Sequence, residues 1–406
     1  MPDVTIPLVE HDPRLARRVI GTLTAANLFL FFGAGAQQQF LMSYLGDLTG
    51  WSSALRSTII AAVYFSMMVF RIANVWLLRR WPDRRQTIVG SLTYTGFCVV
   101  MALFFFERQY ALALGAALVW GWGGAALWAG SSLQILTATD QGKAQYGSTI
   151  GVLYTATHLG FSLGVVGLGW VYALVPKESL YLLYVVAAGV SLLGNVVLLA
   201  TPRLDHVEPE QPSLAGLLEL MMKAKALISG FLQLAAALSF GLMLGSFGDV
   251  IKVSYGKGWI WLLAAPYPLA RLAWGWASGA LSDRLGRAWA LAASFLFVAA
   301  SLAGCGMWSS PATLGVASAA LGLLSSTVPV IASAIVGDSA DRKRRPLAYG
   351  SLFVYHGAGV AIATLAGASL RAHFVTFQPV FLIFAGVFAV CGVVSVALQR
   401  WAEQRL

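Results

Sequence analysis

The sequence predicts an all-helical membrane protein in which 12 transmembrane helices form two six-helix bundles around a central cavity. Three observations lead to this fold class. The chain of 406 residues is 58% hydrophobic and only 11% charged, against roughly 45–50% and about 25% in soluble domains. The apolar residues lie in long uncharged runs, and a faint repeat relates the two halves. This composition excludes a soluble cytosolic enzyme, a disordered chain and a nucleic-acid-binding protein.

The first half of the chain contains six stretches that are long enough to cross a membrane. A spanning helix needs about 20 mostly apolar residues, and the only charge inside these stretches is Arg71 in the second. The six stretches are 19–46, 57–78, 86–106, 109–139, 144–176 and 179–202. We therefore expect an N-terminal bundle over residues 1–202.

A polar segment separates the halves. RLDHVEPEQPS, which begins at Arg203, carries two prolines and predicts a cytoplasmic linker over residues 203–225. Its second part, from Ser213, has a short amphipathic pattern that is compatible with a helix on the membrane surface.

The second half repeats the rhythm and predicts a C-terminal bundle over residues 226–406. Its uncharged stretch at 288–337 is too long for one helix, and Trp308-Ser309-Ser310-Pro311 divides it into two spans. Arg271 is the only charge inside a span of this half. The stretches are 226–248, 258–282, 288–337, 346–370 and 372–399.

Lysine and arginine set the expected orientation. Most of the 27 basic residues fall in the loops that share a side with both termini, which predicts that both termini are cytoplasmic. The net charge of +10 then reflects topology and contact with anionic lipid rather than nucleic acid. We expect a monomer in a plasma or inner membrane.

The internal repeat is visible when the sequence is shifted by 200 residues. Arg71-Ile72-Ala73 then aligns with Arg271-Leu272-Ala273, and Asp83-Arg84 aligns with Asp283-Arg284. Each match is short, but the matches run in order along two six-span halves. Such symmetry is typical of transporters whose substrate site lies near the membrane midplane between the halves.

One loop of the second half carries a family signature. Gly279-Ala280-Leu281-Ser282-Asp283-Arg284-Leu285-Gly286-Arg287 resembles the loop 8–9 signature G-x-L-x-D-R-x-G-R of the major facilitator superfamily, and the span count, linker and repeat extend the resemblance over the whole chain. Asp83 and Arg84 remain from a degenerate copy in loop 2–3. The resemblance implies a secondary transporter whose signature residues form a conformational latch. The alternative is a basic loop that only fixes topology. The latch residues are Gly279, Asp283, Arg284, Gly286, Arg287, Asp83 and Arg84.

Arg71 and Arg271 are the first candidates for substrate binding. Charged groups inside spans usually face the bundle interior and mark the transport path, and all 17 acidic residues can be assigned to loops or helix ends. A bound anion is the natural counter-ion, because guanidinium groups bind oxyanions with two hydrogen bonds. The arrangement resembles that of nitrate/nitrite porters, although their glycine-rich signatures are absent, and that of oxalate and monocarboxylate transporters. The alternative is that backbone carbonyls or polar groups of other helices satisfy the arginines.

Other polar and aromatic residues accompany the arginines. Tyr267 stands one turn before Arg271 and is placed to share its ligand. Gln38, in a run of three glutamines in span 1, is expected to line the cavity. The tryptophans of span 4 are expected to serve packing, with the lining of a cavity as the alternative: Trp120, Trp122 and Trp128.

His158 and His356 are the histidines well inside the spans, and histidine changes charge near neutral pH. We expect them to contact substrate and to carry a coupling proton, with Asp249 at the outer end of span 7 as the competing carrier. The alternative is a neutral imidazole bonded to a neighbouring serine or threonine. No cofactor, metal or catalytic constellation is evident, and Cys98, Cys305 and Cys391 are expected to be small buried hydrophobes.

The resulting hypothesis is a secondary active transporter, not an enzyme. It would move a small organic or inorganic anion by alternating access, with protons as the candidate coupling ion. One alternative is a transporter of neutral or amphipathic solutes, including an efflux carrier, in which the arginines act as structural locks. The other is a scaffold or regulator that resembles a transporter without transporting.

Overall fold

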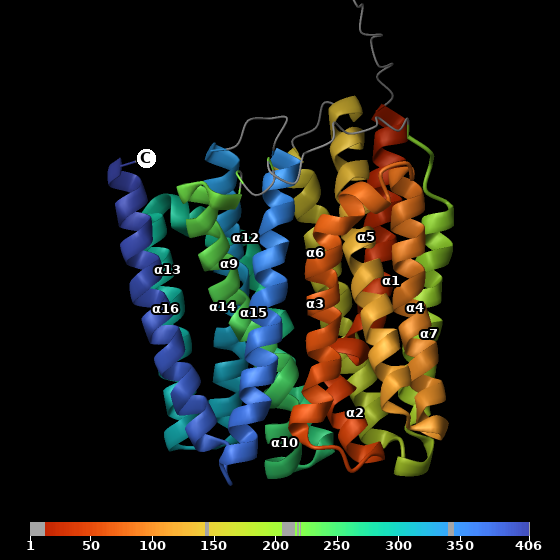
Figure 1. The fold of residues 1–406 in the computed structure, drawn as a ribbon, viewed down its shortest axis with the longest axis vertical. Helices are drawn as coiled ribbons and strands as arrows, with labels where there is room; N and C mark the ends of the chain where they lie inside the picture. The colour runs from red at the N-terminus through yellow and green to blue at the C-terminus, as the bar shows by residue number, and fades with distance from the viewer. Residues whose placement is uncertain are drawn as a thin grey trace, which may run out of the picture.

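The predicted all-helical membrane fold is confirmed by the computed structural model (Figure 1). The structure describes residues 13–142, 146–204, 216, 219, 221–339 and 345–405. In this part of the chain, 11 helices are long and apolar enough to cross a membrane. The remaining span is formed by α11 (Ile260–Ala264) and α12 (Pro266–Leu285), which are shorter and carry Arg271.

The first half of the chain forms six spans. A π-helical turn, η1, interrupts the first of them, so that α1, η1 and α2 together make one long span. The elements are α1 (Pro13–Gly35), η1 (Ala36–Phe40), α2 (Leu41–Leu48), α3 (Ser53–Leu77), α4 (Asp83–Glu107), α5 (Tyr110–Gly142), α6 (Tyr146–Leu174), η2 (Lys177–Ser179) and α7 (Tyr181–Leu199).

The second half repeats the pattern, including a π-helical turn, η3, in its first span. The predicted surface helix from Ser213 lies largely outside the described residues. The elements are α9 (Ala224–Leu242), η3 (Met243–Phe247), α10 (Gly248–Tyr255), η4 (Lys257–Trp259), α11, α12, α13 (Arg287–Met307), α14 (Pro311–Ser339), α15 (Arg345–His373) and α16 (Gln378–Arg405).

Figure 1 shows the two halves side by side, with α1–α7 in red to yellow-green and α9–α16 in green to blue. Across the boundary between them, α3 packs against α15 and α6 packs against α12. We call this boundary the seam. The short helices α2 and α10 lie at the end of the molecule opposite the C-terminus (Figure 1), which we call the far end.

Two residues break the helices at defined places. Pro266 begins α12 and thereby divides the eighth span at Ala265, as expected from the missing N–H of proline. Gly286 alone separates α12 from α13 and has a φ of 88°, which a residue with a side chain rarely adopts. The second glycine of the family signature is therefore required by the turn itself.

Within each half, glycines let neighbouring backbones touch. A Cβ on Gly160 or Gly164 of α6 would overlap the carbonyl oxygen of Leu28 or Phe32 of α1. In the second half, Gly359 of α15 faces the carbonyl of Leu234 of α9 in the same way. Small residues at such contacts are typical of membrane helix packing. The seam helices α6 and α15 are thus fixed against the first helix of their own half.

Gly164→Ala should destabilise the protein because the new methyl group meets backbone atoms of α1 that cannot rotate away. Overpacking of this kind costs about 1–3 kcal/mol. Gly151→Ala in the same helix is the matched control, since nothing lies within 4 Å of its Cβ position and alanine favours helix. Thermal unfolding of both variants in detergent should show a lower Tm for Gly164→Ala and an equal or higher Tm for Gly151→Ala. Equal behaviour of the two would contradict the close α1–α6 contact.

Candidate solute-binding site

Arg71 projects from α3 into the seam. Its Nη1 donates to the carbonyl oxygen of Ala125 on α5 at 3.3 Å. Its Cζ lies 4.3 Å from the ring centroid of Phe353 on α15, across the seam. Its Nε is buried and has no hydrogen-bond partner. The guanidinium group therefore keeps hydrogen-bonding capacity that the protein does not use.

Arg271 occupies the corresponding place on α12. Its Cζ lies 5.5 Å from the ring centroid of Phe240 and 5.6 Å from that of Tyr267, and its Nε is also buried without a partner. Among the described residues, no carboxylate forms an ion pair with Arg71 or Arg271. The two positive charges are therefore uncompensated by the described part of the protein.

A stack of four rings runs across the seam beside Arg71. The ring centroids are 6.2 Å apart between Phe353 and Trp128, 5.5 Å between Trp128 and Tyr154, and 6.3 Å between Tyr154 and His158. The ring planes are tilted by only 23–28° from one another. All four side chains are half-buried. We call this group, which joins α5, α6 and α15, the seam stack.

The histidines are connected to the arginines through aromatic rings. The ring of His356 lies 6.1 Å from that of Phe240, which Arg271 also faces. His158 ends the ring stack whose other end, Phe353, faces Arg71. His356 accepts a hydrogen bond at its Nδ1 from Nε2 of Gln233, at 3.3 Å.

The hydroxyl groups on the helix of His158 are engaged elsewhere. Thr155 donates to the carbonyl of Gly151, and Ser162 donates to the carbonyl of His158 itself. The structure therefore brings the two arginines and the two histidines into one neighbourhood, and neither of these two hydroxyl groups pairs with the His158 imidazole.

Tyr267 and the glutamine run are each positioned by other groups of the protein. Tyr267 is fully buried, its hydroxyl pairs with that of Ser325 at 2.7 Å, and its ring faces Arg271. Gln38 is half-buried. Its neighbour Gln39 is 1% exposed with both amide atoms unpartnered. Gln37 donates to the carbonyl of Tyr94.

Two residues near Arg71 were not predicted from the sequence to bind a solute. Asn74, about one turn after Arg71 on α3, is buried with both amide atoms unpartnered. Trp128 lies in the seam stack, whereas Trp120 packs against Phe97 as expected, with ring centroids 4.6 Å apart. In the sequence, Trp128 is marked by its position one helical turn after the glycine pair Gly123-Gly124.

Two ion pairs join the halves at the far end. Arg56 pairs with Asp249 at 3.0 Å, and Lys252 pairs with Asp47 at 2.5 Å. The hydroxyl of Tyr172 also donates to Asp47. Each pair links α2 or α3 of one half to α10 of the other. Asp249, expected as the competing proton carrier, is therefore held in an ion pair at this end.

The signature loop is described only in part. Gly279 and Asp283 both lie in α12, and the position of the Asp283 side chain is outside the described structure. Arg284 is exposed. In the degenerate copy, Asp83 begins α4, and Arg84 donates to the carbonyls of Thr201 and Leu199 at the end of α7. Arg84 therefore braces two helices of the same half.

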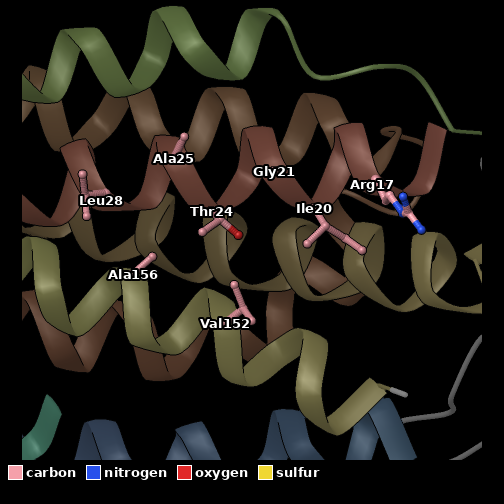
Figure 2. Close-up of a pocket in the computed structure, with 8 residues that line it drawn as sticks. All are labelled: Arg17, Ile20, Gly21, Thr24, Ala25, Leu28, Val152 and Ala156. Carbon is pink, nitrogen blue, oxygen red and sulfur yellow. The ribbon is translucent and has the colours of Figure 1, made fainter. Parts of the chain in front are cut away.

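A separate groove lies between α1 and α6 (Figure 2). It has a volume of about 380 Å³ and is lined by Arg17 and Thr24 together with apolar residues, among them Ile20, Leu28 and Val152. It contains no residue of the arginine site. Within the described residues, no cluster of three or more His, Cys, Asp or Glu side chains could hold a metal ion.

Comparisons with known proteins place this geometry in a family. The sequence model of the Major Facilitator Superfamily matches residues 20–278 and 260–404. No curated protein sequence matches the chain. Solved structures with the same fold include the nucleoside transporter NupG, with a TM-score of 0.70 at 14% identity over 94% of this chain and 98% of that one.

A structure from a study of substrate recognition in proton dependent oligopeptide transporters has a TM-score of 0.72 at 14% identity, over 96% and 99% of the two chains. A bacterial homologue of the human drug peptide transporters has a TM-score of 0.74 at 13% identity, over 96% and 100%. At these identities the likeness establishes the fold alone.

Reversing one charge of the Arg56–Asp249 pair should weaken the far-end contact. Both side chains are 13% exposed, so the cost of breaking this partly buried pair should lie between the ~1 kcal/mol of a surface pair and the roughly 3–5 kcal/mol of a fully buried one. Arg56→Asp and Asp249→Arg should each lower the Tm, and the double variant should regain at least half of the loss. Lys177→Glu, an exposed reversal between α6 and α7, is the control. If the double variant loses as much as the two single variants combined, the pair does not hold the halves together.

Proposed function

The chain belongs to the Major Facilitator Superfamily and is a membrane transporter, and we propose that its solute is a small organic or inorganic anion that it carries by alternating access. The observation that supports this most is the pair of half-buried arginines, each with a buried Nε atom. Among the described residues no carboxylate balances either charge, and each keeps an unpartnered Nε. A charge inside a span costs about 2.5–3.5 kcal/mol or more, which a bound anion offsets when it neutralises both.

The far-end ion pairs support transport by alternating access. Alternating access requires the seam to close at one end while the solute site communicates with the other. The two pairs Arg56–Asp249 and Lys252–Asp47 close the far end. The expected orientation puts both termini in the cytoplasm of a plasma or inner membrane, so the far end would face outward. In this conformation the solute site would then be reached from the cytoplasm. The signature loop around Asp283 would then act as the latch of the opposite conformation.

Coupling to protons belongs to the same proposal. His158 and His356 are the groups of the site that can take up and release a proton near neutral pH. The ring of His356 lies 6.1 Å from that of Phe240, which Arg271 also faces at 5.5 Å, so a proton on this histidine and an anion at Arg271 would lie close enough to attract each other. This electrostatic link would let anion and proton enter together.

One observation favours a different solute. Arg71 already lies over Phe353 and donates to Ala125, so it resembles a structural lock as well as a ligand group. In that case the solute would be neutral. A nucleoside is such a solute, and NupG, which has the same fold, is a nucleoside transporter. The two proposals differ in what happens when the guanidinium groups are replaced.

Arg71→Lys and Arg271→Lys should each lower anion uptake into proteoliposomes by about tenfold or more, because lysine keeps the charge but loses the two-pronged hydrogen bonds. Uptake of labelled carboxylates and nitrate measures this. Arg371→Lys is the control, since Arg371 lies at the end of α15 and donates only to the carbonyls of Phe374 and Val375.

Two outcomes decide between the proposals. Unchanged anion uptake in both lysine variants, at normal expression, would contradict the anion site. Uptake of neutral solutes that survives both substitutions would support the structural-lock alternative. A pH-sensitive dye inside the same vesicles shows whether protons accompany the anion, and His158→Gln and His356→Gln identify the carrier.

A further inference from the structure

We infer that the anion carries a planar aromatic ring, so that the site takes an aromatic carboxylate. The carboxylate would lie between Arg71 and Arg271, and the ring would lie against the seam stack. This inference rests on the proposed anion transport and specifies its substrate class. Three features of the site support it: the orientation of the rings, their position relative to the charges, and their origin in both halves.

The orientation of the rings is the first feature. Trp128 lies between Tyr154 and Phe353 with planes tilted by 23° and 28°, and Tyr154 continues to His158 at 27°. Many other ring pairs of the protein meet edge to face, for example Tyr94 with Trp120 at 83°. The near-parallel rings of the seam stack therefore form a wall against which a further planar ring can stack with an offset.

The second feature is that charge lies directly beside the wall. The guanidinium group of Arg71 lies 4.3 Å from the centroid of Phe353, the ring at one end of the stack. An anionic group that meets this guanidinium therefore lies beside a ring face. This proximity fits a ligand whose carboxylate is attached to, or close to, its ring.

The third feature is that the wall crosses the seam. Trp128 and Tyr154 belong to the first half, whereas Phe353 belongs to the second. A ring bound against them contacts both halves at once, as a solute must if it is to influence their relative movement.

Alternative ligands satisfy only part of this site. Nitrate or acetate would neutralise the arginines and leave the ring wall unused. A saturated ring is puckered and cannot stack, and a neutral aromatic molecule leaves both charges without a partner. Only the combination of negative charge and a planar ring uses both features.

Calorimetric titration of the purified full-length protein tests this with five probes: benzoate, cyclohexanecarboxylate, benzamide, acetate and nitrate. Benzoate should bind about tenfold more tightly than each of the others. Trp128→Leu should reduce the affinity for benzoate towards that for cyclohexanecarboxylate and leave acetate unchanged. Trp289→Leu is the control, because Trp289 is 66% exposed on α13. If Trp128→Leu does not fold, Tyr154→Leu tests the same wall.

The outcomes distinguish a failure of aromatic specificity from a failure of the proposed anion transport. If none of the anions binds, or if benzamide binds as well as benzoate, anion transport fails and this inference fails with it. If acetate, nitrate or cyclohexanecarboxylate binds as tightly as benzoate, the anion site stands and the aromatic specificity is overturned. A preference for benzoate that is unchanged in Trp128→Leu and Tyr154→Leu would also overturn it.

Discussion

Charge balance between the two halves is the constraint on which the rest of this structure depends. In a bundle surrounded by lipid, each buried charge needs a partner or a function. Arg71 and Arg271 have rings and a carbonyl around them but no carboxylate in the described part of the chain. Their repeated position on α3 and α12 places two uncompensated cations on opposite sides of the seam.

At the far end, unlike at the arginine site, the charges are paired. There each cation of one half meets an anion of the other, in the pairs Arg56–Asp249 and Lys252–Asp47. Paired opposite charges hold two protein surfaces together, whereas unpaired positive charges attract an anionic ligand. The protein thus uses paired charge where the halves close on each other and unpaired charge where we propose that a solute binds. Tight glycine contacts fix neighbouring helices within each half against one another.

The sequence predicted the fold and the charged part of the site because both have strong local signals. Apolar runs separated by charges define the spans, and an arginine inside a span is conspicuous. The aromatic part could not be found in the same way. Tyr154 and Phe353 are ordinary residues of apolar helices, and only the docking of α6 and α15 brings them to Trp128.

Long-range contacts and local distortions explain the remaining differences. Arg56 and Asp249 are separated by 193 positions, and nothing in the sequence fixes how the halves meet. The π-helical turn η1 changes the phase of the first span, so Gln37 and Gln39 are fully buried and Gln38 is only half-buried. A regular 3.6-residue repeat does not anticipate this shift.

The central claim is that Arg71 and Arg271 share one bound anion. A crystal structure with an iodinated benzoate, recorded at a wavelength where iodine scatters anomalously, tests it most directly. The account predicts a single iodine peak beside the seam stack, with the carboxylate in contact with both guanidinium groups. An ordered ligand elsewhere, or a carboxylate that contacts neither arginine, would contradict it.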